Sequence, residues 1–226
     1  MNKTCTLFIL LGIFFLISCR KENSEKIDQN QIWSEYRLIY RSDIDSTFMR
    51  ARFIHNDVDG ENLKLSDKST ILISGKSPNY NPSFMWYERI TQGKDSIVDF
   101  YYSDLDGQSF SNTVSLISEA EIPETDTIYK DSVVFFPWIG NPLQEGELML
   151  LVLDGNLSSQ LPVISTDTIG ASGIYLFPDS LSPLPLGEIT IHFERFNIQE
   201  ANGNAVGAKS YAHYISKKKE VKLVER

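Results

Sequence analysis

The sequence predicts an all-β fold organised as antiparallel β-sandwiches. Aromatic residues make up 12% of the 226 residues, and aromatic side chains favour strands over helices. From Trp33 onward, short segments rich in aromatic and β-branched residues alternate with turn residues. The chain shows no amphipathic pattern long enough for an ordinary helix. These three observations predict strands throughout the folded part.

The N-terminal segment has the pattern of an export signal. Lys3 precedes an apolar run from Leu7 to Ile17, which is too short for a membrane-spanning helix and ends at Ser18-Cys19. We therefore expect residues 1–18 to be a signal peptide that is removed. The small residue directly before Cys19 resembles the signal of bacterial lipoproteins, in which the Cys thiol receives a diacylglyceryl group and becomes the new N-terminus. This resemblance implies lipidation at Cys19 and membrane anchoring through acyl chains.

Residues 19–32 are expected to form a lipidated, disordered tether. The polar run from Arg20 to Lys26 has no periodicity, so a solvated spacer is the plain interpretation. Cys19 followed by Lys21-Glu22 is also similar to the start of many lipoproteins of the Bacteroidota, in which a charged cluster after the Cys can direct export to the cell surface. That resemblance implies an outer-membrane protein, anchored by its lipid on the periplasmic or the cell-surface side.

Residues 33–118 are predicted to form a first β-sandwich domain. Asp59-Gly60, Gln92-Gly93 and Asp106-Gly107 are expected to be tight hairpin turns. About seven strands in this length are typical of an immunoglobulin-like sandwich. The expected strands are Tyr36 to Arg41, Thr47 to His55, Leu63 to Leu65, Thr70 to Ser74, Phe84 to Ile90, Ser96 to Tyr102 and Ser109 to Leu116.

Residues 119–125 are predicted to be a linker, because acids and Pro123 interrupt the strand pattern there. Residues 126–226 are predicted to form a second sandwich. The Pro-rich segment from Pro178 to Gly187 cannot be a central strand and is expected to cross from one sheet to the other. The expected strands are Thr127 to Phe136, Glu147 to Leu153, Leu161 to Ile164, Ile174 to Phe177, Glu188 to Phe196, Lys209 to Ser216 and Glu220 to Val224, with turns at Asp154-Gly155 and Asn202-Gly203. Both halves resemble sandwich domains of Bacteroidota surface lipoproteins, many of which have no assigned activity.

Charge and cysteine content exclude several functions. Removal of residues 1–18 would leave 20 basic and 30 acidic residues, a formal net charge of −10. An acidic surface is repelled by phosphate backbones, so nucleic acid is not an expected partner. Loss of Cys5 and lipidation of Cys19 would leave no thiol in the fold, which excludes disulfides and cysteine nucleophiles.

No catalytic residue, metal site or cofactor is selected by the sequence. His55, His192 and His213 each stand alone in a predicted strand, where packing or solvated roles are favoured over metal binding. The acidic loop from Asn56 to Asn62 superficially suggests calcium, but its glycine is misplaced for a calcium loop and a hairpin turn explains it.

Aromatic residues are the remaining candidates for binding. Trp33, Tyr80, Trp86 and Tyr87 are possible binding aromatics, because exposed rings can stack on sugars or anchor a protein partner. For Trp86 and Trp138, packing between two sheets is the alternative.

A repeated tripeptide suggests modification. Asp, a hydroxyl residue and then an aliphatic residue or Thr recur six times. Turn formation followed by a strand start is one explanation. The other is a resemblance to the O-glycosylation acceptor of exported Bacteroidota proteins, which implies glycans on Ser46, Ser96, Thr127, Ser132, Thr168 and Ser180.

The sequence therefore favours a lipid-anchored envelope or cell-surface protein that acts by binding or in a structural role, not by catalysis. Its expected partners are the membrane, through the lipid, and an envelope protein or a glycan. The alternatives are a glycan-binding accessory lipoprotein of an outer-membrane nutrient importer and, third, a carboxylate-dependent hydrolase. A flat exposed apolar patch would favour a protein partner, and exposed coplanar aromatics would favour a glycan.

Overall fold

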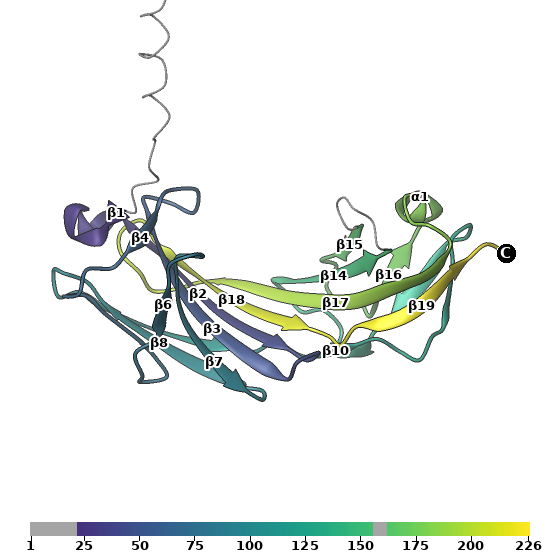
Figure 1. Cartoon of the computed structure of the whole chain (residues 1–226), viewed down its shortest axis with the longest axis horizontal. Coiled ribbons are helices and arrows are strands. Elements are labelled where there is room, and N and C mark those ends of the chain that lie inside the picture. Colours follow the sequence, from purple (N-terminus) through teal and green to yellow (C-terminus); the bar gives the residue numbers. More distant parts are fainter. Residues whose placement is uncertain (1–21, 156–161) are drawn as a thin grey trace, which may run out of the picture.

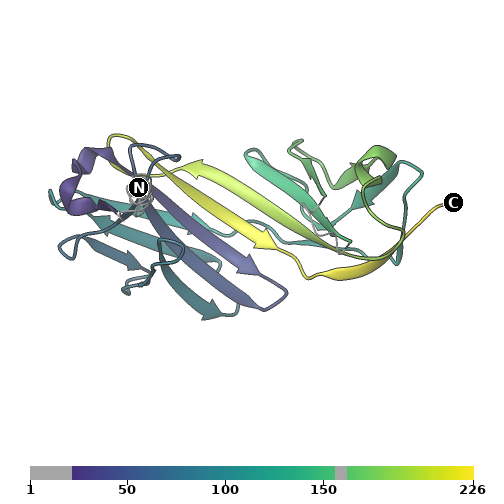
Figure 2. The ribbon, with the colours of Figure 1, turned by 45° about the horizontal axis from the view of Figure 1, so that its top comes forward.

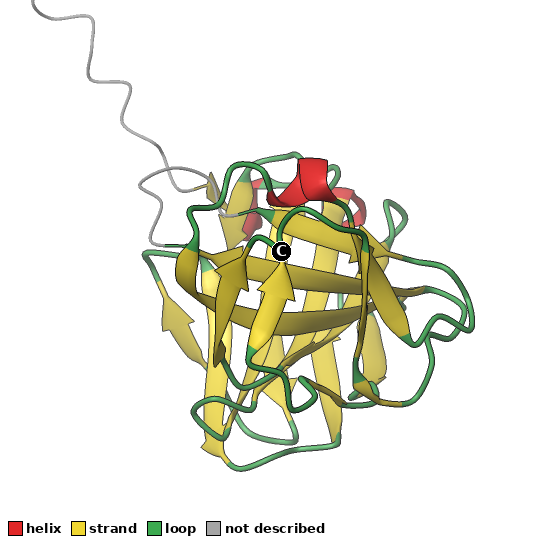
Figure 3. Ribbon diagram, turned by 90° about the vertical axis from the view of Figure 1, so that its right-hand side faces the viewer, coloured by secondary structure: helices red, strands yellow, loops and turns green. Residues whose placement is uncertain are grey.

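The structure is a computed structural model that describes residues 22–155 and 162–226. Cys19 and the expected signal peptide lie outside the described residues. The chain is nearly all β, with 55% strand and 5% helix, and its antiparallel sheets form a sandwich-like arrangement (Figure 3). The predicted fold class is therefore confirmed. Among the described residues, no helix has the length and apolar composition needed to cross a membrane.

The first part of the chain, from residue 22 to residue 115, forms most of the N-terminal half of the molecule. Its elements are β1 (Glu22–Asn23), η1 (Ser24–Lys26), η2 (Gln29–Gln31), β2 (Ile32–Arg41), β3 (Ser46–His55), β4 (Asn62–Lys64), β5 (Thr70–Ile73), β6 (Asn79–Asn81), β7 (Trp86–Gln92), β8 (Ile97–Ser103) and β9 (Ser109–Ser115).

The second part of the chain, from residue 120 onward, supplies the remaining elements. Its elements are β10 (Ala120–Glu121), β11 (Thr127–Tyr129), β12 (Val134–Pro137), β13 (Ile139–Gly140), β14 (Glu147–Asp154), β15 (Val163–Thr166), β16 (Gly173–Leu176), α1 (Pro178–Leu181), β17 (Gly187–Glu200), β18 (Ala208–Ile215) and β19 (Lys219–Val224).

One large sheet runs through both halves. In the described part of the chain its main path is β1-β4-β3-β2-β18-β17-β14-β15. The 14-residue β17 makes this continuity possible, because its first part pairs with β19 and its last part pairs with β18, while β14 lies along its middle. Figures 1 and 2 show β17 and β18 passing from one half to the other.

Strand β18 belongs to the N-terminal half, although it comes late in the sequence. It pairs in parallel with β2 over eight residues, from Ala208 opposite Ser34 to Ile215 opposite Arg41. Parallel pairing needs a long connection and cannot be read from neighbouring segments. The expected division into residues 33–118 and 126–226 therefore fails for β18.

Two hydrophobic cores lie along the molecule. The first is covered by the three-stranded sheet β5-β8-β9 and contains Tyr36, Phe53 and Phe100, together with Ala208 and Ala212 of β18. The second is covered by the two-stranded sheet β12-β16. It contains Ala120, Phe136, Trp138, Leu151, Ile174, Ile191 and Phe193. The expected linker 119–125 is thus part of the second core at Ala120, and β10 pairs with β13.

Residues 22–32, expected to lie in the tether, take part in the fold. Strand β1 pairs in parallel with β4. Ser24 is fully buried, and its Oγ accepts a hydrogen bond from the Ser66 amide at 2.9 Å. The Gln29 side chain donates to the carbonyls of Ser24 and Ile27 at 2.9 and 2.8 Å. The expectation of a disordered tether is therefore wrong from Glu22 onward.

The turns agree with the sequence in part. Asp106-Gly107 and Asn202-Gly203 each join strands that pair with each other, as predicted. Gln92-Gly93 instead joins β7 to β8, which lie in different sheets, because β7 pairs with β3 and β6. The expected strand from Thr127 to Phe136 is divided into β11 and β12 by the turn at Asp131-Ser132. The Pro-rich segment leads from β16 to β17 and so crosses between sheets, as predicted.

Candidate functional site

Two of the predicted binding aromatics are buried. Trp33 is 6% exposed and Tyr87 is 8% exposed. The Tyr87 ring packs against Phe53 and Tyr80, with ring centroids 5.8 and 4.9 Å apart, and its hydroxyl accepts a hydrogen bond from the Leu65 amide at 2.8 Å. Burial raises the pKa of Tyr87 to about 12. Tyr87 belongs to the first core, and neither buried ring is available to a ligand.

Trp86 is half-buried and packs against cations. The guanidinium groups of Arg37 and Arg52 lie 5.1 and 4.9 Å from its ring centroid, which is cation–π distance. Both arginines also pair with the carboxylate of Glu35, which is fully buried on β2. The ring therefore screens a buried ion cluster from water, which explains its position better than ligand stacking does.

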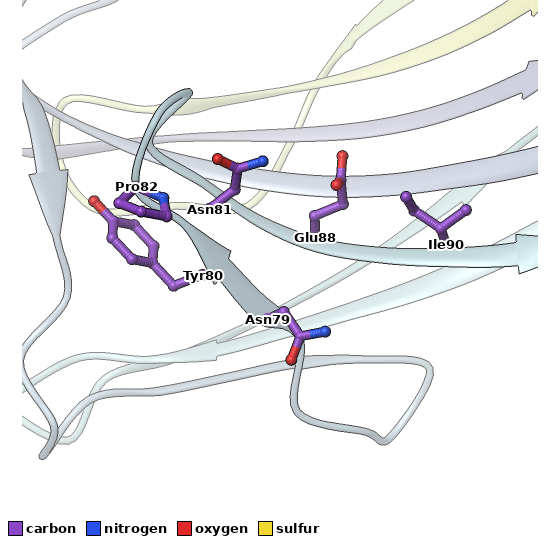
Figure 4. Close-up of a pocket in the computed structure, with 6 residues that line it drawn as sticks. All are labelled: Asn79, Tyr80, Asn81, Pro82, Glu88 and Ile90. Atoms are coloured by element: carbon purple, nitrogen blue, oxygen red, sulfur yellow. The ribbon is translucent and has the colours of Figure 1, made fainter.

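Tyr80 lines a groove beside the β6–β7 turn. The groove has a volume of about 410 Å³ and is formed by Asn79, Tyr80, Asn81, Pro82, Glu88 and Ile90 (Figure 4). Glu88 is paired with Arg50, and the Asn81 side-chain oxygen accepts a hydrogen bond from the Ser83 amide at 3.1 Å. The groove thus offers carboxamides and one carboxylate around a partly exposed aromatic ring.

A cluster of exposed aromatic rings lies elsewhere, on the outer side of the β12-β16 sheet. We call Phe135, Tyr175 and Phe177 the aromatic patch; they are 46%, 58% and 52% exposed. Phe135 lies opposite Tyr175 in the strand register, and their ring centroids are 5.1 Å apart. Tyr175 and Phe177 are 6.5 Å apart. The rings are tilted by 54° and 34°, so they form an uneven apolar surface and not a coplanar platform.

Alternation along two short strands creates the aromatic patch. Phe136 and Ile174 point into the second core, so their neighbours Phe135 and Tyr175 point outward. Gly173 leaves room for the Phe135 ring, because a Cβ at Gly173 would lie 2.4 Å from its Cζ atom. The sequence analysis did not select these residues, since the strands are too short for a clear period of two.

Trp138 is a core residue, in agreement with the interpretation that it packs between two sheets. It is 5% exposed and packs edge-on against Phe193 with ring centroids 6.1 Å apart. Its Nε1 donates to the Asn141 carbonyl at 3.0 Å.

A carboxylate bridges two histidines that the sequence analysis treated as isolated. His192 Nε2 lies 3.1 Å from Glu194 Oε1, and His213 Nε2 lies 3.2 Å from Glu194 Oε2. The His213 ring also stacks on Phe196 with centroids 3.9 Å apart. The pairing of His192 with Glu194 follows from their spacing on β17, but the approach of His213 depends on the β17–β18 register.

The electrostatics of this His–Glu–His cluster favour an ionised carboxylate. Burial alone would raise the pKa of Glu194, but the hydrogen bonds and charges of His192 and His213 together outweigh it and lower the pKa from 4.5 to about 2. Glu194 Oε1 is hydrogen-bonded to His192, and Glu194 Oε2 lies within ion-pair distance of His213. Across residues 22–155 and 162–226, no group of three or more His, Cys, Asp or Glu side chains is arranged to hold a metal ion.

The loop from Asn56 to Asn62 connects the antiparallel strands β3 and β4. The carboxylate of Asp57 accepts a hydrogen bond from the Asp59 amide at 3.0 Å. The acidic side chain therefore stabilises a turn, as the hairpin interpretation predicted.

The six candidate hydroxyl residues differ in exposure. Ser96, Thr127, Thr168 and Ser180 are exposed, whereas Ser46 and Ser132 are half-buried. The Ser132 Oγ is buried and has no hydrogen-bond partner among the described residues. Ser46 and Thr127 open strands and Ser96 directly precedes one, as turn chemistry would also explain. Thr168 lies in a loop, and Ser180 lies in α1.

Comparisons with known proteins give little further information. No family model matches the chain, and no curated protein matches it. Among solved structures, the chain is similar to one described as structural insight into host cell surface retention of a 1.5-MDa bacterial ice-binding adhesin. The likeness has 11% identity and covers 88% of this chain and 67% of that chain, with a TM-score of 0.25. At this TM-score the likeness supports no inference about function.

Proposed function

We propose that this protein is a lipid-anchored protein of the bacterial outer membrane that acts by binding another envelope protein, and not by catalysis. The anchor would be Cys19, on the basis of the apolar run and the small residue before it. The exposed aromatic patch on the β12-β16 sheet is the observation that carries the binding proposal.

The composition of the aromatic patch favours a protein partner over a sugar. Large exposed apolar surfaces on soluble domains mark interaction sites. Val133 and Ile139, in the segments around β12, are 57% and 60% exposed and belong to the same part of the chain. Two of the three patch rings are phenylalanines, which offer no hydroxyl or indole N–H to a sugar. Removal of such rings from water would supply much of the binding free energy.

Site-specific photocross-linking tests this proposal. A benzophenone amino acid would replace Phe177 in the full, lipidated protein in its native host. The matched control is Phe84, which is 67% exposed on the β6–β7 turn in the other half. We expect a discrete adduct of higher mass from position 177 and none from position 84. Equal labelling at both positions, or none at either, would contradict a dedicated site on the aromatic patch.

A glycan-binding accessory role is the second candidate. The groove of Asn79, Asn81 and Glu88 favours it, since carboxamides and carboxylates are suited to sugar hydroxyls. Asn79→Ala should then weaken binding on a glycan array, while a patch variant such as Tyr175→Ser should not. The opposite pattern would favour the protein partner.

A further inference from the structure

The hydrogen bonds of the β12-β16 sheet leave a free backbone edge beside the aromatic patch. The Trp138 amide donates to the Ser172 carbonyl at 3.1 Å and continues the β12–β16 register. In antiparallel pairs, hydrogen-bonded and non-hydrogen-bonded positions alternate. The Phe136–Ile174 pair is therefore hydrogen-bonded, and the Phe135–Tyr175 pair is not.

It follows that the N–H and C=O groups of Phe135 point away from β16. Pro137 is also at a non-hydrogen-bonded position of β12, so its lack of an N–H removes no hydrogen bond to β16. Among the described residues, β12 pairs with no strand other than β16. The Phe135 backbone thus lies at an open edge, and its side chain lies in the aromatic patch.

The charges around this edge identify the chemistry of a partner. Asp131 precedes β12, Asp167 lies on the loop before β16 and Asp179 follows β16; all three are exposed. Lys130 Nζ donates to the Leu184 carbonyl. The Arg226 amide donates to the Asp131 carboxylate at 3.0 Å, and the Arg226 guanidinium lies over the Tyr129 ring. The β12-β16 sheet therefore carries exposed rings, and exposed acidic side chains flank its two strands in the sequence.

From these observations we infer that the β12 edge accepts an extended, basic segment of a partner protein as an added strand. Alternate apolar side chains of that segment would cover the aromatic patch, and its Lys or Arg side chains would face Asp131 and Asp179. This inference deepens the proposed function and rests on it.

A second copy of this chain fits the edge less well. Each copy carries a net charge of −9, which opposes self-association.

The test uses the purified folded protein and a ten-residue synthetic peptide of alternating Val and Lys as the probe. Calorimetry or fluorescence anisotropy would measure its affinity. Three control peptides are used. One has the same composition with the Val and Lys residues in separate blocks, and one has Glu in place of Lys. The third carries N-methyl groups on the backbone nitrogens that would donate to β12. We expect each control to bind at least tenfold more weakly. Equal affinity of the N-methylated peptide would overturn strand addition.

Two protein variants isolate the backbone contribution. Phe135→Val keeps the free N–H, whereas Phe135→Pro removes it at a position where no ladder bond is lost. We expect Phe135→Pro to bind the probe at least tenfold more weakly than Phe135→Val, and equal binding would refute the inference. If Phe135→Pro does not fold, the N-methylated peptide decides the question on the unmodified protein.

The outcome can be separated from that of the proposed function. Adducts at position 177 that persist in Phe135→Pro would keep the aromatic patch as a binding site and reject the added strand. Sedimentation velocity tests whether a second copy of this chain occupies the edge. A dimer that Phe135→Pro abolishes would identify that second copy as the occupant and would refute the proposal of a basic partner protein.

Discussion

Substitution of Glu194 by Gln tests the His–Glu–His cluster through the pH dependence of stability. The folded pKa of Glu194 is about 2, against an ordinary value of 4.5. Because the folded state holds this carboxylate ionised more strongly than the unfolded chain does, it binds fewer protons between these pH values. The stabilisation by Glu194 is therefore fully present above about pH 4.5 and is lost as the pH falls toward 2.

The magnitude follows from the same values. At about 1.4 kcal/mol per pH unit, a depression from 4.5 to about 2 corresponds to at most about 3.5 kcal/mol of unfolding free energy. Glu194 is 22% exposed, so solvent screens part of this. The amide of Glu194→Gln keeps the shape of the side chain but not its charge. We expect this variant to be less stable by about 2 to 3 kcal/mol at pH 6.

Urea unfolding followed by circular dichroism from pH 3 to 7 measures this difference. The matched control is Glu200→Gln on the same strand, where Lys209 Nζ is 3.9 Å from an exposed carboxylate, and surface pairs of this kind contribute little. The stability difference between wild type and Glu194→Gln should shrink as the pH falls, while the control difference stays small. A difference that is constant with pH, or that grows in acid, would refute the reasoning.

Three further predictions concern the anchor, a buried ion pair and modification. Cys19→Ala should move the protein from the membrane fraction to the soluble fraction or leave it with its signal, and continued metabolic labelling with lipid would reject the lipoprotein proposal. Arg195 is fully buried and paired with Glu147, and it also donates to two loop carbonyls. Arg195→Met should lower the unfolding free energy by about 3 to 5 kcal/mol in chemical denaturation, because the buried carboxylate of Glu147 loses its ion-pair partner. A loss below about 1 kcal/mol would contradict this. If the tripeptides are glycosylated, peptide mass spectrometry of the native protein should find glycan at exposed Ser96 before half-buried Ser132, whereas a mass equal to chain plus lipid would exclude modification.

The sequence predicts the strands well because their signals are local. The segment from Glu147 to Leu153 is a short apolar run that ends at the Asp154-Gly155 turn, and the observed β14 ends one residue later. Sheet partners are decided by contacts between distant segments, which explains why the parallel pairing of β18 with β2 was missed. The approach of His213 to Glu194 depends in turn on the exact register of the β17–β18 pair.

The candidate site was less predictable than the fold for a related reason. A large aromatic ring in a short strand looks the same in the sequence whether it faces the core or the solvent. Tyr87 and Trp33 are buried, and Tyr175 is exposed. The side on which a ring lies depends on which strand covers it, and this is settled only when the two sheets pack.

The continuous sheet leads to a prediction about how the molecule unfolds. The β17–β18 hairpin contributes Phe193 to the second core and Ala212 to the first, so neither core is complete without it. Figure 1 shows β1, which lies within the segment expected to be the tether, at one end of the molecule and β16, which carries Tyr175, toward the other. A rigid connection would hold the aromatic patch away from the membrane surface.

Tryptophan fluorescence can report on each half separately. Trp33 lies in the N-terminal half and Trp138 lies in the second core, so variants that retain one or the other, with Phe at the remaining Trp positions, give two local probes. Ala212→Asp places a charge in the first core, where Ala212 is 4% exposed, and should destabilise folding by several kcal/mol. Because the halves share β17 and β18, we expect both probes to show the same lowered urea midpoint. If the midpoint falls at Trp33 and is unchanged at Trp138, the halves unfold independently, and the sheet does not act as a rigid support for the aromatic patch.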